Sequence, residues 1–256
     1  MMKDRSWIAP PAVFIAGIVT LVAVWLALEP QTTMRLFDND GRSPVELATL
    51  PLFAAIVLLV FWKCPFSGSP ARRRILSIAV AIVATMAIVK ELDLHNAALH
   101  LLWPDCVGAD GSLVPGRFVK PNGSPLTGTP FKMRVVTNGS VPLSMKVAII
   151  AYFVSFFGVF AAGFAYLFPG WLAGVFALDA ASWSFGCFGA CGVVVQIADR
   201  LPSWLNHAGG LENAADGSVG AAKALCTALE EGGEFMLAFF ALYTILLAHR
   251  KLLKKT

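Results

Sequence analysis

The polar run KELDLHNAALH, residues 90–100, holds side chains that could bind a metal or transfer protons. It follows the aliphatic segment ILSIAVAIVATMAIV without a break. At 100° per residue along a helix, Glu91 and His95 lie one turn apart on the same face. Asp93 and His100 lie close together on roughly the opposite face. The first pair therefore offers metal ligands, and the second pair offers supporting groups for general acid–base catalysis.

A second apolar segment carries a similar polar interruption, TALEEGGE, at residues 227–234. Glu230 and Glu234 share one stripe of a helix, and Glu231 stands to one side. If the two segments face each other, the ligand set is Glu91 with His95 and Glu230 with Glu234. Carboxylate and imidazole ligands suit a divalent metal such as Zn²⁺, Mn²⁺ or Fe²⁺, which lowers the pKa of a bound water.

The same residues allow two further interpretations. Charged groups at membrane depth are costly and tend to face a wet interior, so the acids and histidines could form a proton relay or a cation pathway. They could also be simple ion pairs, such as Lys90 with Glu91 and Lys223 with Glu230, where helices reach the headgroups. The sequence leaves all three interpretations open.

The composition places this chemistry in a membrane. Hydrophobic residues make up 57% of the 256 residues and charged residues only 14%, whereas soluble domains carry about a quarter charged residues. Such a chain cannot cover its surface in water, and it has no long polar block that could form a soluble domain. We therefore expect a single membrane domain, 1–256. The basic residues form no face with aromatics, which argues against nucleic-acid binding.

Six apolar stretches are long enough, or nearly so, to cross about 30 Å of hydrocarbon. The predicted spans are 7–28, 47–63, 75–102, 147–168, 171–198 and 221–248. They predict an all-α integral membrane protein, a bundle of about six transmembrane helices. One long loop, 104–146, joins the third and fourth spans, and the alternation in FKMRVV indicates a short strand there. Lys132 and Arg134 of this loop could bind an anionic headgroup.

The fifth predicted span contains residues that invite functional interpretations. Asp179 falls about eight residues into it, which favours an intramembrane acid hydrogen-bonded to a neighbouring helix over a proton carrier. Cys187 and Cys191 are four residues apart, a spacing that could hold a metal, although small packing residues are the favoured interpretation. The five cysteines of the chain are scattered and indicate no disulfide framework.

The distribution of basic residues predicts the orientation. Lys3 and Arg5, the arginine triplet 72–74 and the tail 250–255 fall on one side if there are six spans. The positive-inside rule then puts both termini in the cytoplasm and the long loop outside. The first apolar run is too long for a typical signal peptide, so we expect a retained span. The predicted location is the inner (plasma) membrane.

In general manner only, the sequence resembles small polytopic inner-membrane proteins of bacteria, a likeness that assigns no residues. We expect a polar pocket near the outer leaflet and a metal-dependent hydrolase or transferase acting on a lipid-like substrate. The alternatives are a non-catalytic accessory or assembly subunit of a membrane complex and a proton- or cation-coupled transporter. The expected partners are membrane lipid and either other proteins or further copies of the chain.

Overall fold

The computed structural model describes residues 5–38, 43–63, 65–207 and 220–253. Five helices in these ranges are long and apolar enough to cross a membrane, and a bent pair brings the number to six. The described residues form no strand, so the predicted all-α membrane bundle is confirmed and the chain is a multi-pass membrane protein. The helices are η1 (Ser6–Ile8), α1 (Ala9–Ala27), α2 (Pro30–Phe37), α3 (Pro44–Trp62), α4 (Pro70–Glu91), α5 (Leu94–Leu102), α6 (Met133–Val136), α7 (Leu143–Phe153), η2 (Val154–Gly158), α8 (Val159–Phe176), α9 (Ala180–His207) and α10 (Ala221–Leu253).

Polar caps define where the two helices α3 and α4 begin. Ser43 and Glu46 form a capping box, in which the Ser43 hydroxyl accepts from the Glu46 amide at 3.1 Å and the Glu46 carboxylate accepts from the Ser43 amide at 2.8 Å. Ser69 accepts from the amide of Arg72 at 3.3 Å. A proline follows each cap at the first helical position, where its missing N–H is not needed.

The third predicted span is broken into two helices. Helix α4 ends at Glu91, and α5 leaves it at an angle of 75°. Asp93 lies at the break with φ of 54°, in the left-handed region that Asp and Asn tolerate better than most residues. The Asp93 carboxylate accepts from the Asn96 side-chain amide at 2.7 Å. The polar run is therefore divided between two helix directions, which the assumption of one straight helix did not anticipate.

The fourth and fifth spans are divided at a different point from the predicted one. Helices α7 and α8 continue through the π-helical turn η2 as one apolar span of 34 residues, Leu143–Phe176. Pro169 lies inside α8 instead of ending it, as prolines can in transmembrane helices where other groups satisfy the freed carbonyl. The chain turns at Leu178, which has φ of 56°, and α9 begins at Ala180.

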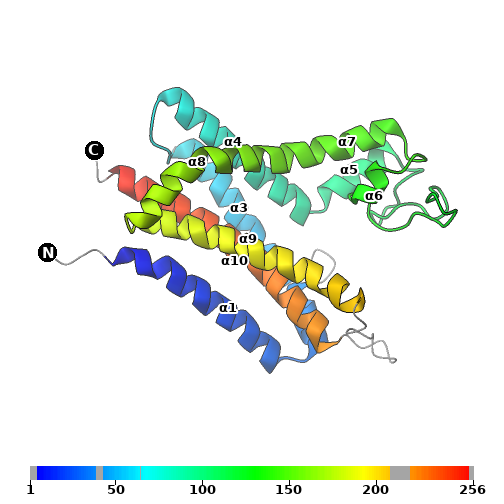
Figure 1. Ribbon diagram of the computed structural model, residues 1–256, viewed down its shortest axis with the longest axis horizontal. Coiled ribbons are helices and arrows are strands. Elements are labelled where there is room, and N and C mark those ends of the chain that lie inside the picture. Colours follow the sequence, from blue (N-terminus) through cyan, green and yellow to red (C-terminus); the bar gives the residue numbers. More distant parts are fainter. Residues whose placement is uncertain (1–4, 39–42, 64, 208–219, 254–256) are drawn as a thin grey trace.

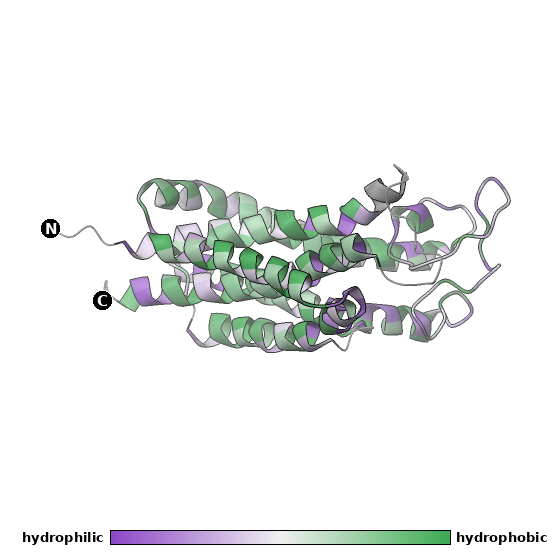
Figure 2. Cartoon of the chain, turned by 90° about the horizontal axis from the view of Figure 1, so that it is seen from below, coloured by the Kyte–Doolittle hydropathy of each residue, from purple (hydrophilic) through white to green (hydrophobic). Residues whose placement is uncertain are grey.

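Helix α10 is the centre of the bundle and packs against α9, α3, α1 and α2. Figure 1 shows both ends of the chain at one end of the molecule, together with the turn from α3 to α4 and the turn from α8 to α9. Helices α5 and α6 and the long loop lie at the opposite end. Hydrophobic residues cover the helices and polar residues are frequent in the loop (Figure 2).

The long loop is folded on a core of its own. Val107, Leu113, Phe118 and Val135 are buried in it, and the cluster continues onto one face of α7. The segment predicted as a strand contains the helical turn α6 instead, and the β-structure of the described loop is two isolated bridges. Apolar residues spaced through the loop therefore form a small packed unit at the end of the bundle.

Candidate functional site

Three carboxylates from two helices meet between the end of α4 and the middle of α10. Glu91 is the last residue of α4, and Glu231 and Glu234 lie one turn apart on α10. One carboxylate oxygen of each residue lies within 4.8 Å of the others. We call Glu91, Glu231 and Glu234 the carboxylate cluster. The two polar segments of the sequence therefore face each other, which is the condition on which the predicted site depended.

Lys90 supplies the positive charge that faces this cluster. Its ammonium donates to both carboxylate oxygens of Glu234, at 2.6 and 2.5 Å, and to Glu91 at 3.5 Å. The Glu91 side chain is only 6% exposed and that of Glu234 is 19% exposed, whereas half of the Lys90 side chain is open. One ammonium thus faces three carboxylates, two of them well shielded.

The basic residues near the ends of the same helices give the depth of the cluster. Lys90 follows Arg74 by sixteen residues on α4, and Arg250 follows Glu234 by sixteen residues on α10. At about 1.5 Å per residue, each separation is about 24 Å along the helix. If the arginines mark one interface, the cluster lies in the far part of a hydrocarbon layer about 30 Å thick.

A glycine pair lets neighbouring helices approach α10 beside the cluster. A Cβ atom on Gly232 would overlap the side chain of Leu21 in α1. A Cβ atom on Gly233 would come within 2.7 Å of a methyl group of Val195 in α9. Glycine therefore allows α1 and α9 to pack closely against the segment that carries the glutamates.

The predicted metal ligands are distributed between two places. Glu91 and Glu234 come together, and Glu231 is the third member of the described group instead of Glu230. His95 lies elsewhere: its ring packs against Phe131 and Tyr152, with centroid separations of 4.7 and 5.4 Å. The break after α4 explains this placement, because it turns the face of α5 away from the direction of Glu91.

The two residues predicted to support catalysis have structural contacts in this arrangement. Asp93 is 61% exposed and forms the turn between α4 and α5. The Nδ1 atom of His100 donates to the carbonyl of Val107 at 2.8 Å, a bond that ties α5 to the folded loop. Both residues therefore position the loop-bearing end of the molecule, and neither belongs to the described carboxylate group.

The cluster has the chemistry of an oxygen-lined cation site. Carboxylates are the ligands that hard cations such as Mg²⁺, Ca²⁺ and Mn²⁺ prefer, whereas Zn²⁺ sites usually include imidazole or thiolate. Three such groups close together in a poorly solvated place repel one another strongly, so a proton or a cation bound among them is favoured. The arrangement can bind a metal ion, share protons, or do both in turn.

Asp179 lies outside the spans, in the turn between α8 and α9, and not within the membrane as predicted. Its carboxylate accepts from the amide and hydroxyl of Ser182 at 3.2 and 2.9 Å, and from the Lys251 ammonium at 2.8 Å. Partial burial alone would raise the pKa of Asp179, but the hydrogen bonds from Lys251 and Ser182 outweigh it and lower the pKa. Asp179 thus caps α9 and ties it to the end of α10.

The cysteines of the fifth span pack in the core. Cys187 and Cys191 are buried in a cluster with Met236 and Phe240 of α10. They are free thiols, as are the other two cysteines in the described part of the chain. These contacts fit the favoured interpretation of the pair as small packing residues.

No protein-family model, curated protein or solved structure matches this chain. The functional proposal below therefore rests on the chemistry of the carboxylate cluster and on its position in the bundle.

Proposed function

We propose that this protein is a cation-coupled membrane transporter in which the carboxylate cluster binds a divalent metal ion or protons in exchange for Lys90. The observation that carries the proposal is the meeting of three carboxylates and one ammonium from two different spans. Charged groups at this depth are expensive and usually serve an ion or proton path. The oxygen ligands favour Mn²⁺ or Mg²⁺ over the Zn²⁺ and Fe²⁺ that the predicted histidine suggested.

Lys90 has the properties of a competing internal cation. Its ammonium contacts both oxygens of Glu234, so an ion bound there must displace it. Half of the Lys90 side chain is open and its stem is flexible, so the ammonium can move away from Glu234 when a cation arrives. Exchange between Lys90 and a mobile cation leaves the carboxylates with a positively charged partner at each step.

Transport fits these contacts better than hydrolysis of a lipid-like substrate. A hydrolase needs a substrate-sized hollow beside its metal. Two hollows in the described part of the chain are lined by other residues: one lies between α3 and α4, and the other is an apolar hollow between α9 and α10. His95, which the sequence predicted as a metal ligand, packs among aromatic rings.

A flux measurement tests the proposal directly. The full chain is reconstituted into liposomes that contain a Mn²⁺-sensitive or pH-sensitive dye, and a Mn²⁺, Mg²⁺, Ca²⁺ or proton gradient is imposed. Glu234→Gln removes one charged ligand, an interaction of about 1.5–3 kcal/mol, so we expect flux at limiting cation to fall ten- to hundredfold. Glu230→Gln, one helical turn away and outside the described group, is the comparison variant and should lower flux much less than Glu234→Gln.

The outcomes separate transport from a static metal site. Absence of flux for all four gradients, in protein that elemental analysis shows to carry a metal, would contradict transport. The metal would then be a bound cofactor. Equal flux in Glu234→Gln and the wild type would show that the carboxylate cluster takes no part in transport. Circular dichroism of each variant shows whether the bundle has kept its helical content.

We also propose that the membrane is the inner (plasma) membrane, with both termini in the cytoplasm. The support is the positive-inside rule together with the shared position of the termini, the α3–α4 turn and the α8–α9 turn (Figure 1). Basic residues gather at this end in the arginine triplet and at Arg250 and Lys251. The carboxylate cluster then lies nearer the outer leaflet, where an external cation would enter.

A further inference from the structure

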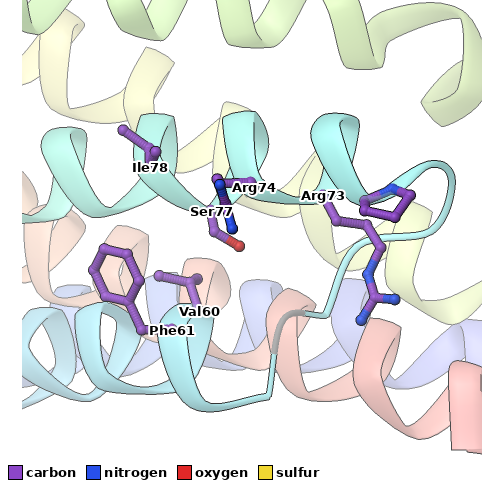
Figure 3. A pocket seen from close by; sticks show the side chains of 7 residues that line it. Val60, Phe61, Arg73, Arg74, Ser77 and Ile78 are labelled. Atoms are coloured by element: carbon purple, nitrogen blue, oxygen red, sulfur yellow. The ribbon is translucent and has the colours of Figure 1, made fainter.

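A groove of about 450 Å³ lies between the end of α3 and the beginning of α4 (Figure 3). The carboxylate cluster lies at the other end of α4. It has the size of a small-molecule binding site. Its lining residues are Val60, Phe61, Pro70, Arg73, Arg74, Ser77 and Ile78. The groove therefore belongs to the end of the bundle that holds the chain termini.

The two halves of the groove differ in chemistry. Phe61 and Ile78 form an apolar wall, 61% and 44% exposed, along the membrane-facing part of the two helices. Arg73 and Arg74 lie in the first turns of α4, and both are exposed. Neither forms an ion pair within the described residues. The groove thus offers positive charge at its outer end and hydrocarbon contact toward the membrane.

Arg72 shows that the triplet does not act as one uniform patch. Its guanidinium lies over the ring of Tyr166 in α8, 5.2 Å from the ring centroid, and it does not line the groove. The side chain of Arg72 therefore contacts α8, whereas Arg73 and Arg74 line the groove.

We propose that this groove binds one anionic phospholipid, with the phosphate on Arg73 and Arg74 and the beginning of an acyl chain on Phe61 and Ile78. Guanidinium groups bind phosphate oxygens through paired hydrogen bonds, which a zwitterionic headgroup uses less well because its own ammonium competes. A free phosphate ion would use the arginines alone. The apolar wall beside them therefore favours a lipid as the occupant.

Native mass spectrometry of the delipidated full chain tests the site, with phosphatidylglycerol and phosphatidylcholine of identical acyl chains as probes. The wild type should bind phosphatidylglycerol more tightly. Each basic residue near a membrane surface contributes about 1 kcal/mol, so Arg73→Gln/Arg74→Gln should weaken this binding about thirtyfold. Arg117→Gln/Lys120→Gln removes the same charge from the long loop and should leave binding unchanged, as should Arg72→Gln.

A second arm separates the lipid from a free anion. Phe61→Ser keeps both arginines, so it should weaken phosphatidylglycerol binding several-fold and leave binding of inorganic phosphate unchanged. The proposal is overturned if the wild type binds both lipids equally, if the loop control loses as much affinity as the groove variant, or if Phe61→Ser changes nothing while phosphate displaces the lipid. Helical content measured by circular dichroism accompanies every variant.

Discussion

Lys90 has a different role from the surface lysines of this protein, because it faces three carboxylates, two of which are well shielded. Its pair with Glu234 links α4 to α10, two helices that are 144 residues apart in the chain at this contact. Removing the ammonium leaves the carboxylates without a partner, which costs more than the loss of an exposed ion pair. Stability and cation binding are therefore coupled at this one side chain.

We predict that Lys90→Met lowers the free energy of unfolding by about 2 kcal/mol, between the values for exposed and buried pairs because Lys90 is half exposed. Denaturation in detergent measures this change. Lys223→Met, an exposed lysine on the same α10 surface as the cluster region, is the control and should change little. Adding Glu234→Gln to Lys90→Met should recover part of the loss, and a fully additive double variant would contradict the coupling.

Asp179 gives a pH-dependent prediction at the other end of the bundle. Its pKa is lower in the folded protein than its ordinary value near 4, so the folded state holds fewer protons there than the unfolded state. The resulting stabilisation is fully present above the ordinary pKa and is lost as pH falls through the lower folded pKa. Asp179→Asn should therefore cost about 1 kcal/mol at pH 7 and progressively less as the pH falls below the ordinary pKa.

Thermal unfolding of wild type and Asp179→Asn between pH 7 and pH 2 checks this dependence. Asp199→Asn is the comparison variant, since the Asp199 carboxylate pairs only with the adjacent exposed Arg200 among the described ion pairs. A difference between wild type and Asp179→Asn that stays constant over the pH range would show that Lys251 and Ser182 do not favour the ionised carboxylate.

The sequence predicted that acidic residues of two helices meet. It did not predict which residues form the carboxylate cluster. Glu91 and Glu234 could be found because charges inside apolar segments are conspicuous. Glu231 was set aside because helix periodicity alone does not tell which face of α10 meets α4. The sequence pattern does not indicate the left-handed turn at Asp93, which separates His95 from Glu91. The prediction of His95 as a metal ligand assumed one continuous helix.

At the scale of the helices, the glycine pair in α10 determines how closely α1 and α9 can pack. A valine side chain at Gly233 would have to displace Val195, whose own branched side chain has little freedom to rotate. Overpacking of this kind typically costs 1–3 kcal/mol. The glutamates next to the pair are carried by a helix that is fixed on two sides.

We predict that Gly233→Val lowers the free energy of unfolding by about 2 kcal/mol and reduces flux in the liposome assay. Gly189→Val in α9 is the matched control, since nothing lies within 4 Å of a Cβ atom there. The control carries the same change in helix propensity without the contact. Equal stability of the two variants would show that α9 can move away from α10 at no cost.

Helix boundaries were less predictable than the helices themselves. The start of α3 could be recognised from SPVE, because a capping box is a local pattern of side chain and backbone. The end of α8 could not be recognised, because a proline such as Pro169 can either end a helix or lie inside one. Tertiary contacts decide between these cases, and a single sequence does not contain them.

At the scale of the whole molecule, the folded long loop lies at one end of the helical bundle, and the surfaces of the two parts differ. The core of the long loop continues onto α7, whose apolar span with α8 is 34 residues long. A helix of that length measures about 50 Å, well beyond the hydrocarbon thickness of about 30 Å. The span is therefore longer than the hydrocarbon layer requires, and the folded loop packs on its α7 end.

We predict that fluorescent-protein fusions in a bacterial host are bright after residue 256 and after residue 178, whereas a secreted phosphatase is active only when fused near residue 120. The physical reason is the shared position of the two termini at one end of the bundle together with the basic residues at that end (Figure 1). Activity of the phosphatase at residue 256 would reverse the orientation, and activity at only one of residues 178 and 256 would contradict six crossings.

The position of the two chain ends at the same end of the bundle has a practical consequence. A linker that joins the last residue of one copy to the first residue of the next has no bilayer to cross, so two copies can be encoded as one polypeptide. Opening the chain in the long loop while joining the old ends gives a permuted order of the same helices. A gene that encodes two linked copies allows one altered copy to be placed beside one intact copy.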